Sequence, residues 1–248
     1  MKIKIKSDLF GISVKKHFHP DIWEEDASLN FVVRSRLLDI ANDFIEYLEI
    51  LDSEDVEDIR LTGSLANYNY SKYSDIDLHI IVNFEKMGGN NKLIESFFKA
   101  KKTIWNSKHD IKIKGFEVEL YVEDSGEKHF ASGLYSVLKD GWVKKPTRFA
   151  GKVDKENILK KVIDIKERLK HLNKKEATEQ EFRDLLKKIV EMRKGGLERG
   201  GEYSVENLAF KVLRRSGTIK RIVDAFSKLY DKKLSLDEQK LLIDDEDY

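Results

Sequence analysis

The sequence predicts an α+β protein in which a mixed sheet with flanking helices is followed by an α-helical bundle. Runs of alternating or β-branched apolar residues, typical of strands, lie in the first part of the chain together with two helical segments. Beyond Lys152 the apolar residues recur at helical spacing throughout. Because sheet-forming segments come first and only helices follow, we divide the chain into a domain at 1–150 and an α-helical C-terminal domain at 151–248.

The elements of the first domain follow from apolar periodicity and from the turn residues between them. Helical spacing predicts amphipathic helices over 28–51 and 92–105, and alternation or β-branching predicts strands over 56–62, 78–82, 110–114 and 116–122. Gly115 joins the last two strands as a hairpin. We expect both helices to bury their apolar residues, which are Phe31, Val32, Leu37, Leu38, Ala41, Phe44, Ile45 and Leu48 in the first and Leu93, Ile94, Phe97, Phe98 and Ile104 in the second.

Helix-capping residues divide the second domain. Asp154, Thr178 with Glu181, and Ser204 each stand before a run of apolar residues at helical spacing, as N-caps do. Gly217 ends the third of these helices. A further helix over 218–230 and a short one opened by Ser235 and Glu238 complete the predicted bundle.

One motif of the first domain combines a Gly-Ser turn with a pair of carboxylates. The strand over 56–62 runs into Gly63-Ser64, and Asp75-Ile76-Asp77 leads into the next strand. Alternation places both aspartates on one strand face, where they would repel each other unless a cation lay between them. Oxygen ligands of this kind suit Mg²⁺ or Mn²⁺. The glycine lets the backbone approach a phosphate, to which Ser64 and the turn amides can donate, especially if a short helix begins at residue 65.

The arrangement of Gly63, Ser64, Ser74, Asp75 and Asp77 resembles the nucleotidyltransferase superfamily built on the DNA polymerase β catalytic core, in its minimal bacterial and phage forms. The resemblance covers roughly residues 55–125 by motif. It implies a polymerase β-like sheet, and it makes the first domain the catalytic one.

The family also has a third carboxylate, which stands on a later strand. Here the strand over 116–122 carries Glu117 and Glu119 on the face opposite its apolar residues. Glu119 is the better candidate because apolar residues flank it as they usually flank the family's third acid, and Glu117 stays open. The family more often has Asp at this place.

The resemblance implies a two-metal transfer of a nucleoside monophosphate from an NTP to a hydroxyl, with release of pyrophosphate and two Mg²⁺ or Mn²⁺ ions about 4 Å apart. Asp75, Asp77 and Glu119 would be the catalytic metal ligands. The triphosphate would be held by Gly63, Ser64 and Ser74, and by analogy with the family's helical lobe by Lys211 or Arg214.

The acceptor hydroxyl is open between RNA or a tRNA end, a protein and a small molecule. A different class of function is also open. The high charge and the Glu in place of Asp would fit a catalytically inactive nucleotide-binding module, or an antitoxin-like protein-interaction module, of the same fold.

Composition narrows the setting. Charged residues make up 37% of the chain, yet the net charge is only +1, which argues against a broad nonspecific nucleic-acid binder. The chain has no cysteine, so thiolate metal sites are excluded. No apolar run is long enough for a membrane span, so we expect a cytoplasmic protein with no membrane partner. The resemblance implies that it binds ATP or another NTP and that it is of bacterial or phage origin. The oligomeric state is open.

Overall fold

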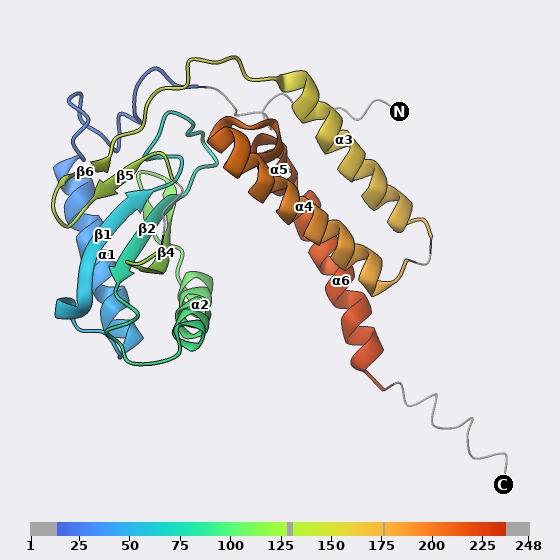
Figure 1. The fold of residues 1–248 in the computed structure, drawn as a ribbon, viewed down its shortest axis with the longest axis horizontal. Helices are drawn as coiled ribbons and strands as arrows, with labels where there is room; N and C mark the ends of the chain where they lie inside the picture. The colour runs from blue at the N-terminus through green and yellow to red at the C-terminus, as the bar shows by residue number, and fades with distance from the viewer. Residues whose placement is uncertain (1–13, 128–130, 176, 237–248) are drawn as a thin grey trace, which may run out of the picture. The chain divides into compact units, whose positions relative to one another are not determined.

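The computed structural model describes residues 14–127, 131–175 and 177–236. Its contacts divide the chain between Gly151 and Lys152 into two compact units. We call the described residues up to 151 the sheet unit and those from 152 onward the helical unit. Figure 1 shows the strands in the first unit and only helices in the second.

The sheet unit is built on one six-stranded mixed sheet with the strand order β3-β4-β2-β1-β5-β6. The strands are β1 (Val56–Thr62), β2 (Ile76–Val82), β3 (Lys112–Ile113), β4 (Phe116–Asp124), β5 (Leu134–Ser136) and β6 (Gly141–Lys144). β2 and β4 run parallel, and every other neighbouring pair is antiparallel. A parallel pair needs a long crossover, and here α2 (Asn91–Lys108) supplies it. The predicted α+β class is confirmed.

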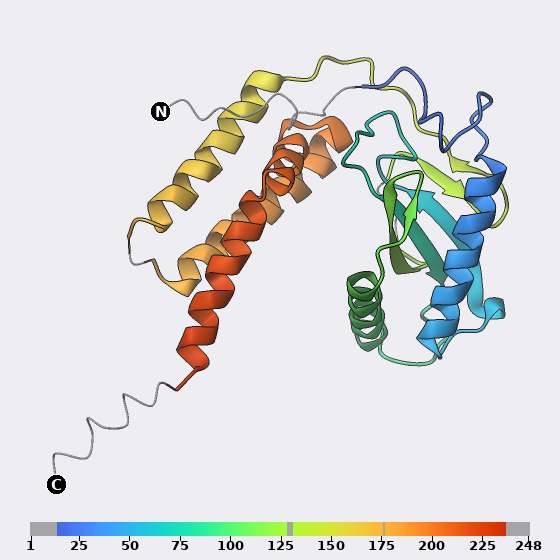
Figure 2. The ribbon, with the colours of Figure 1, turned by 180° about the vertical axis from the view of Figure 1, so that it is seen from behind.

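The first helix, α1 (Phe31–Leu48), lies across one face of the sheet (Figure 2). Asn30 caps it by accepting hydrogen bonds from the backbone N–H groups of its first turn. Its buried stripe begins at Val33, so the prediction that Phe31 and Val32 are core residues was wrong: they are 77% and 67% exposed. Neither has a buried residue three or four positions later in the helix, so both lie off the buried stripe.

The second helix, α2, buries less than its apolar spacing predicts. Phe98 and Trp105 are buried, whereas Leu93 and Ile104, which we expected in the core, are exposed. The reason lies in its position at the sheet margin. Asn106 of α2 donates to the Leu120 carbonyl (3.4 Å) and accepts from the Leu120 N–H (3.3 Å). The helix therefore satisfies the edge of β4 with a side chain, and only a narrow stripe of it reaches the core.

The core residues of the central strands face α1. Leu61, Leu78, Ile80 and Leu120 are each fully buried. Because successive strand residues point to opposite faces, the residues between them lie on the other side of the sheet. That side carries the polar residues of the predicted site.

The helical unit consists of α3 (Lys155–Leu172), α4 (Glu179–Gly200), α5 (Val205–Arg215) and α6 (Thr218–Leu234). The expected N-caps are confirmed: Asp154 and Ser204 accept backbone N–H bonds from α3 and α5, and Thr178 forms a capping box with Glu181. Gly217 adopts a left-handed conformation between α5 and α6. The last helix ends at Leu234, four residues later than expected. The short helix that we expected to be opened by Ser235 and Glu238 lies largely outside the described residues, which end at Leu236.

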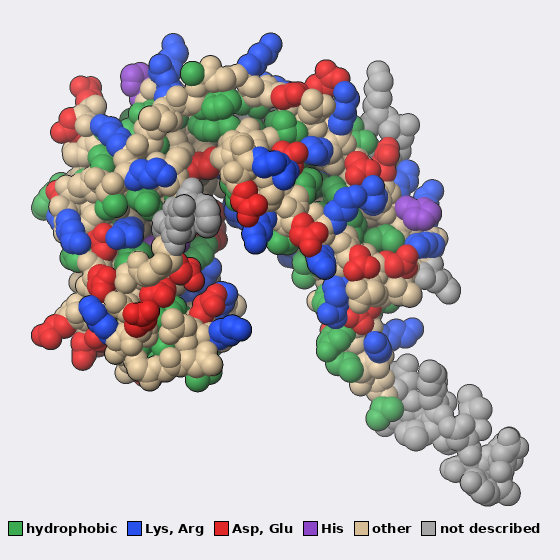
Figure 3. Space-filling view, in the orientation of Figure 1, with side chains coloured by type: hydrophobic (Ala, Val, Ile, Leu, Met, Phe, Trp, Pro, Cys, Tyr) green, Lys and Arg blue, Asp and Glu red, His purple; other side chains and the backbone are tan. Residues whose placement is uncertain are grey.

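The surface carries both signs of charge. Figure 3 shows Lys and Arg side chains interspersed with Asp and Glu over the visible face of each unit, as the near-zero net charge suggests. In the described part of the chain, no helix is both long enough and apolar enough to cross a membrane.

Candidate active site

The Gly-Ser turn lies against the second aspartate of the motif. β1 ends at Thr62, which is paired with Asp77 on the antiparallel strand β2. Gly63 then takes a φ of +75°, a conformation that side chains rarely adopt. A β-carbon at Gly63 would come 1.8 Å from Asp77 Oδ2. Only glycine therefore allows the turn to approach this carboxylate so closely.

The turn is tied to the segment that carries the aspartates. Ser64 Oγ donates to Ser74 Oγ at 2.7 Å, and Ser74 Oγ also accepts the Ser71 N–H at 2.9 Å. Ser74 is buried, whereas Ser64 is half-buried. Residues 63–69 form turns, so the short helix that we considered at Leu65 is not present. The Leu65 carbonyl instead accepts a bond from the Trp23 indole at 2.8 Å, which anchors the turn to the core.

The parallel pair β2 and β4 brings the acids together on the face away from α1. In its register Asp77 is paired with Glu119, and His79 with Tyr121. Asp75 stands immediately before β2. The side chains of the two pairs alternate with buried apolar ones along their strands. Asp77, Glu119, His79 and Tyr121 therefore share one face of the sheet.

The register also separates the two candidate glutamates. Glu119 is half-buried and directly opposite Asp77. Glu117 is exposed and pairs with Lys112 on β3, whose Nζ lies 4.0 Å from Glu117 Oε1. Glu119 is therefore the glutamate that the sheet places beside Asp77, and its role as the third acid stays a prediction.

Two residues that the sequence reasoning missed lie on this acidic face. The Tyr121 hydroxyl donates to Glu119 Oε2 at 2.5 Å. Lys102, which projects from α2, places its Nζ 3.4 Å from the centroid of the Tyr121 ring. Alternation along β4 was a signal that could have identified Tyr121. No comparable signal existed for Lys102, because a lysine on the polar side of an amphipathic helix is commonplace.

His79 extends the same face. The His79 ring stacks on Tyr121, with centroids 4.6 Å apart and planes 11° from parallel. His79 Nδ1 lies 2.9 Å from Glu123 Oε2. Acids and their partners thus continue along β2 and β4 beyond the two aspartates.

Burial and negative charge shape the protonation of this face. Burial, reinforced by Asp77 and Glu119, raises the pKa of the Tyr121 phenol above its usual value. Tyr121 therefore remains a hydrogen-bond donor at neutral pH. Burial lowers the pKa of Lys102, and the charges of Glu119 and Asp77 oppose that change. The ammonium of Lys102 thus acts electrostatically on both carboxylates.

Carboxylate oxygens are the right kind of donor for Mg²⁺ or Mn²⁺. The close approach of the Gly63 turn leaves Asp77 beside backbone that can meet a phosphate. As placed, however, no three His, Cys, Asp or Glu side chains among the described residues are grouped closely enough to hold a metal ion. The residues fit the metal in chemical type, while their arrangement is not that of an assembled metal site.

The two cationic candidates for triphosphate binding lie in the helical unit, on α5. Burial lowers the pKa of Lys211 to about 8, and the positive charges of Arg215, Arg193 and Arg214 add to this effect while Glu202 opposes it. Arg214 is exposed in the last turn of the helix. A cluster of positive charge therefore surrounds Lys211, and its role toward a nucleotide remains a prediction.

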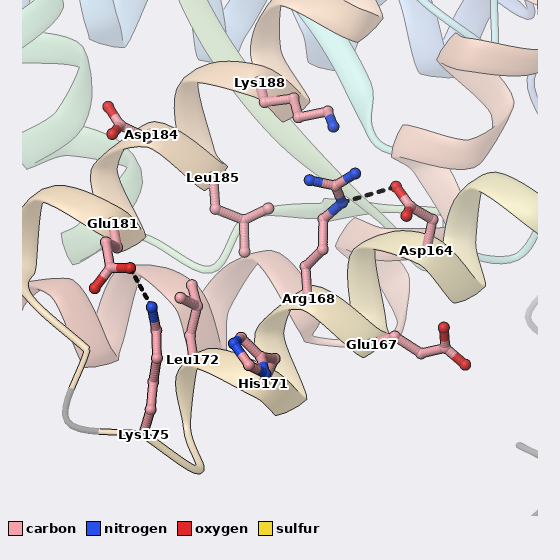
Figure 4. A pocket seen from close by; sticks show the side chains of 10 residues that line it. All are labelled: Asp164, Glu167, Arg168, His171, Leu172, Lys175, Glu181, Asp184, Leu185 and Lys188. Carbon is pink, nitrogen blue, oxygen red and sulfur yellow. Dashed lines mark hydrogen bonds and ion pairs between the residues drawn. The ribbon is translucent and has the colours of Figure 1, made fainter.

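A charged cavity of about 580 Å³ also lies in the helical unit, between α3 and α4 (Figure 4). Leu172 and Leu185 line it together with charged side chains. The dashed lines mark the ion pairs of Arg168 with Asp164, at 3.0 Å, and of Lys175 with Glu181. It contains none of the predicted site residues, and paired charges supply much of its lining.

Comparison with known proteins gives a family match within the sheet unit. The family model described as "nucleotidyltransferase domain" matches residues 44–144, which span the Gly-Ser turn, both aspartates and Glu119. Among solved structures, a STING-associated CdnE c-di-GMP synthase from Capnocytophaga granulosa is 14% identical, with 83% of this chain and 84% of that chain covered and a TM-score of 0.24. No curated protein matched the sequence.

Proposed function

Residues 44–144 form a nucleotidyltransferase domain, and from this premise we propose that the protein is a metal-dependent enzyme that transfers a nucleoside monophosphate from an NTP to a hydroxyl. One observation carries the proposal. Asp77 lies at once against the Gly63 turn and opposite Glu119 on the next strand. A turn suited to phosphate thus adjoins two acids suited to a metal, as transfer of a phosphoryl-linked group requires.

In this reaction the acceptor oxygen forms a bond to the α-phosphorus of the NTP. The bond from that phosphorus to the β-phosphate oxygen breaks, and pyrophosphate leaves. Divalent ions, when bound, neutralise charge on the phosphates and favour loss of the acceptor proton. We assign Asp75, Asp77 and Glu119 to hold those ions.

The turn has a complementary role. Gly63 allows the backbone to approach the triphosphate, and the Ser64 hydroxyl donates to one of its oxygens in place of Ser74. Lys211 and Arg214 are our candidates for further contacts with the triphosphate. The acceptor is RNA or a tRNA end, a protein or a small molecule. Labelling of separate acceptor pools would distinguish these classes.

The test is transfer of label from each α-³²P-NTP, with Mg²⁺ or Mn²⁺, to pools of RNA, protein and small hydroxyl compounds. We expect wild type to release pyrophosphate and label one pool, and Asp77→Ala to do neither. Both proteins should melt as single folded species, so that loss of fold is excluded as the cause.

Equal inertness of wild type and Asp77→Ala with every NTP and acceptor would contradict the enzyme proposal. In that case thermal shift with each NTP separates two remaining functions. Stabilisation by one NTP without release of pyrophosphate would identify a nucleotide-binding module, and no stabilisation would favour a protein-interaction module.

A further inference from the structure

The Glu119 carboxylate is held by a residue of its own strand. The residue directly across from it on β2 is Asp77, yet its oxygen Oε2 accepts a 2.5 Å hydrogen bond from Tyr121, two positions along β4. A hydrogen bond to an ionised acceptor is among the stronger ones in proteins. The bond therefore restrains Glu119 toward its own strand, although the register makes it a neighbour of Asp77.

The donor itself is fixed in place from two other elements. Lys102 of α2 lies 3.4 Å from the ring centroid of Tyr121, and His79 of β2 stacks on the same ring. His79 is in turn bonded to Glu123. Asn106 bonds α2 to the edge of β4. The helix that holds Lys102 is therefore attached to the strand that holds Tyr121. The Tyr121 hydroxyl is thus pre-positioned for Glu119.

On the basis of the proposed metal-dependent function, we propose that Tyr121 is a positioning residue whose hydroxyl occupies Oε2 of Glu119 until a divalent cation replaces it there. The Tyr121 donor and a cation would compete for the same carboxylate oxygen, Oε2 of Glu119. A partner that merely oriented Glu119 as a ligand would instead favour metal binding.

Removal of the Tyr121 hydroxyl should tighten metal binding if it competes with the cation and weaken it if it orients Glu119. The proposal can therefore be tested without measuring turnover. We would measure Mn²⁺ binding by calorimetry, with no nucleotide present, for wild type, Tyr121→Phe, Glu119→Gln and the double variant. Tyr121→Phe keeps the ring and its contacts but removes the donor. We expect it to bind Mn²⁺ about tenfold more tightly, the amount that one hydrogen bond to a charged group is worth. The gain should vanish in the Glu119→Gln background.

Tyr47→Phe is the matched control. Tyr47 is also a tyrosine under a lysine of α2, with Lys101 Nζ 4.7 Å from its ring centroid, and it lies on α1. It should bind Mn²⁺ as wild type does.

Unchanged or weaker Mn²⁺ binding by Tyr121→Phe would overturn the inference, and weaker binding would identify an orienting role instead. Absence of Mn²⁺ binding in both wild type and Tyr121→Phe would overturn it too. The proposed function is judged separately, by pyrophosphate release from wild type. Its failure and that of the Tyr121 inference are therefore distinguishable.

Discussion

The backbone of Gly63 and the carboxylate of Asp77 are so close that a β-carbon on the glycine would lie 1.8 Å from Asp77 Oδ2. Gly63→Ala must therefore displace Asp77 or distort the turn, and the φ of +75° adds strain. We expect a loss of about 1–3 kcal/mol in unfolding free energy and a large fall in kcat/KM. Urea denaturation and pyrophosphate release would measure these two effects.

Gly115→Ala is the matched control for that substitution. Gly115 has a φ of +84°, and a β-carbon there would meet nothing within 4 Å. It should show strain comparable to Gly63→Ala but near-normal turnover. An equal loss of turnover in both variants would mean that Gly63 matters only for folding.

The two glutamates of β4 offer a second pair of matched substitutions. Glu119 faces Asp77, whereas Glu117 faces Lys112 and is exposed. We expect Glu119→Gln to lower kcat by about 100-fold or more, because metal ligation contributes several kcal/mol of transition-state stabilisation. Glu117→Gln should stay within a few-fold of wild type. Single-turnover rates at saturating NTP would decide between them, and the reverse order would make Glu117 the third acid.

Sequence alternation predicted much of this face, because the period of two is a local property of a strand. It placed Asp75 with Asp77, and both glutamates opposite the apolar residues of β4. The alignment of Asp77 with Glu119 could not be predicted in this way, because it is not a local property. β2 and β4 are parallel and separated by α2, so their register depends on how that crossover packs.

Residues whose role depends on tertiary position were the ones missed. Lys102 looks like any solvated lysine of an amphipathic helix, and only the packing of α2 at the edge of β4 brings it to the Tyr121 ring. The exposure of Leu93 and Ile104 has the same origin, since a helix at a sheet margin buries a narrower stripe than its apolar spacing suggests.

The lowered pKa of Lys211 makes the stability of the helical unit pH-dependent. The group titrates near 8 when folded and near 10.5 when unfolded, so the unfolded chain binds more protons between these values. Its contribution to unfolding free energy therefore rises from pH 8 to about 10.5, and the cost of charging it is fully present below pH 8. We expect Lys211→Met to flatten this rise and to be more stable than wild type at pH 7.

Urea denaturation of wild type and Lys211→Met at pH 7, 8, 9 and 10 would test this. Lys220→Met, at an exposed position of α6, is the control and should follow wild type. If the unfolding free energies of wild type and Lys211→Met changed in parallel with pH, the lowered pKa of Lys211 would be contradicted. If Lys211 also contacts the triphosphate, NTP affinity should fall above pH 8, as the ammonium loses its proton.

The hydrogen bond between Ser64 and Ser74 leads to a prediction about substrate binding. Ser64 Oγ now donates to Ser74 Oγ, and in the proposed complex it donates to a phosphate oxygen. Ser64→Ala should therefore raise the KM for NTP about 3- to 10-fold with little change in kcat, because one net hydrogen bond is worth about 1 kcal/mol.

Ser74→Ala should behave differently from Ser64→Ala. Ser74 Oγ also accepts the Ser71 N–H, and it is buried, so its loss leaves a donor unsatisfied in the segment that leads to Asp75. We expect it to lower the melting temperature and kcat together, since the aspartates would be less well positioned. Steady-state kinetics and melting curves of both variants would show this contrast. A fall in kcat alone for Ser64→Ala would mean that its hydroxyl acts in the chemical step rather than in binding.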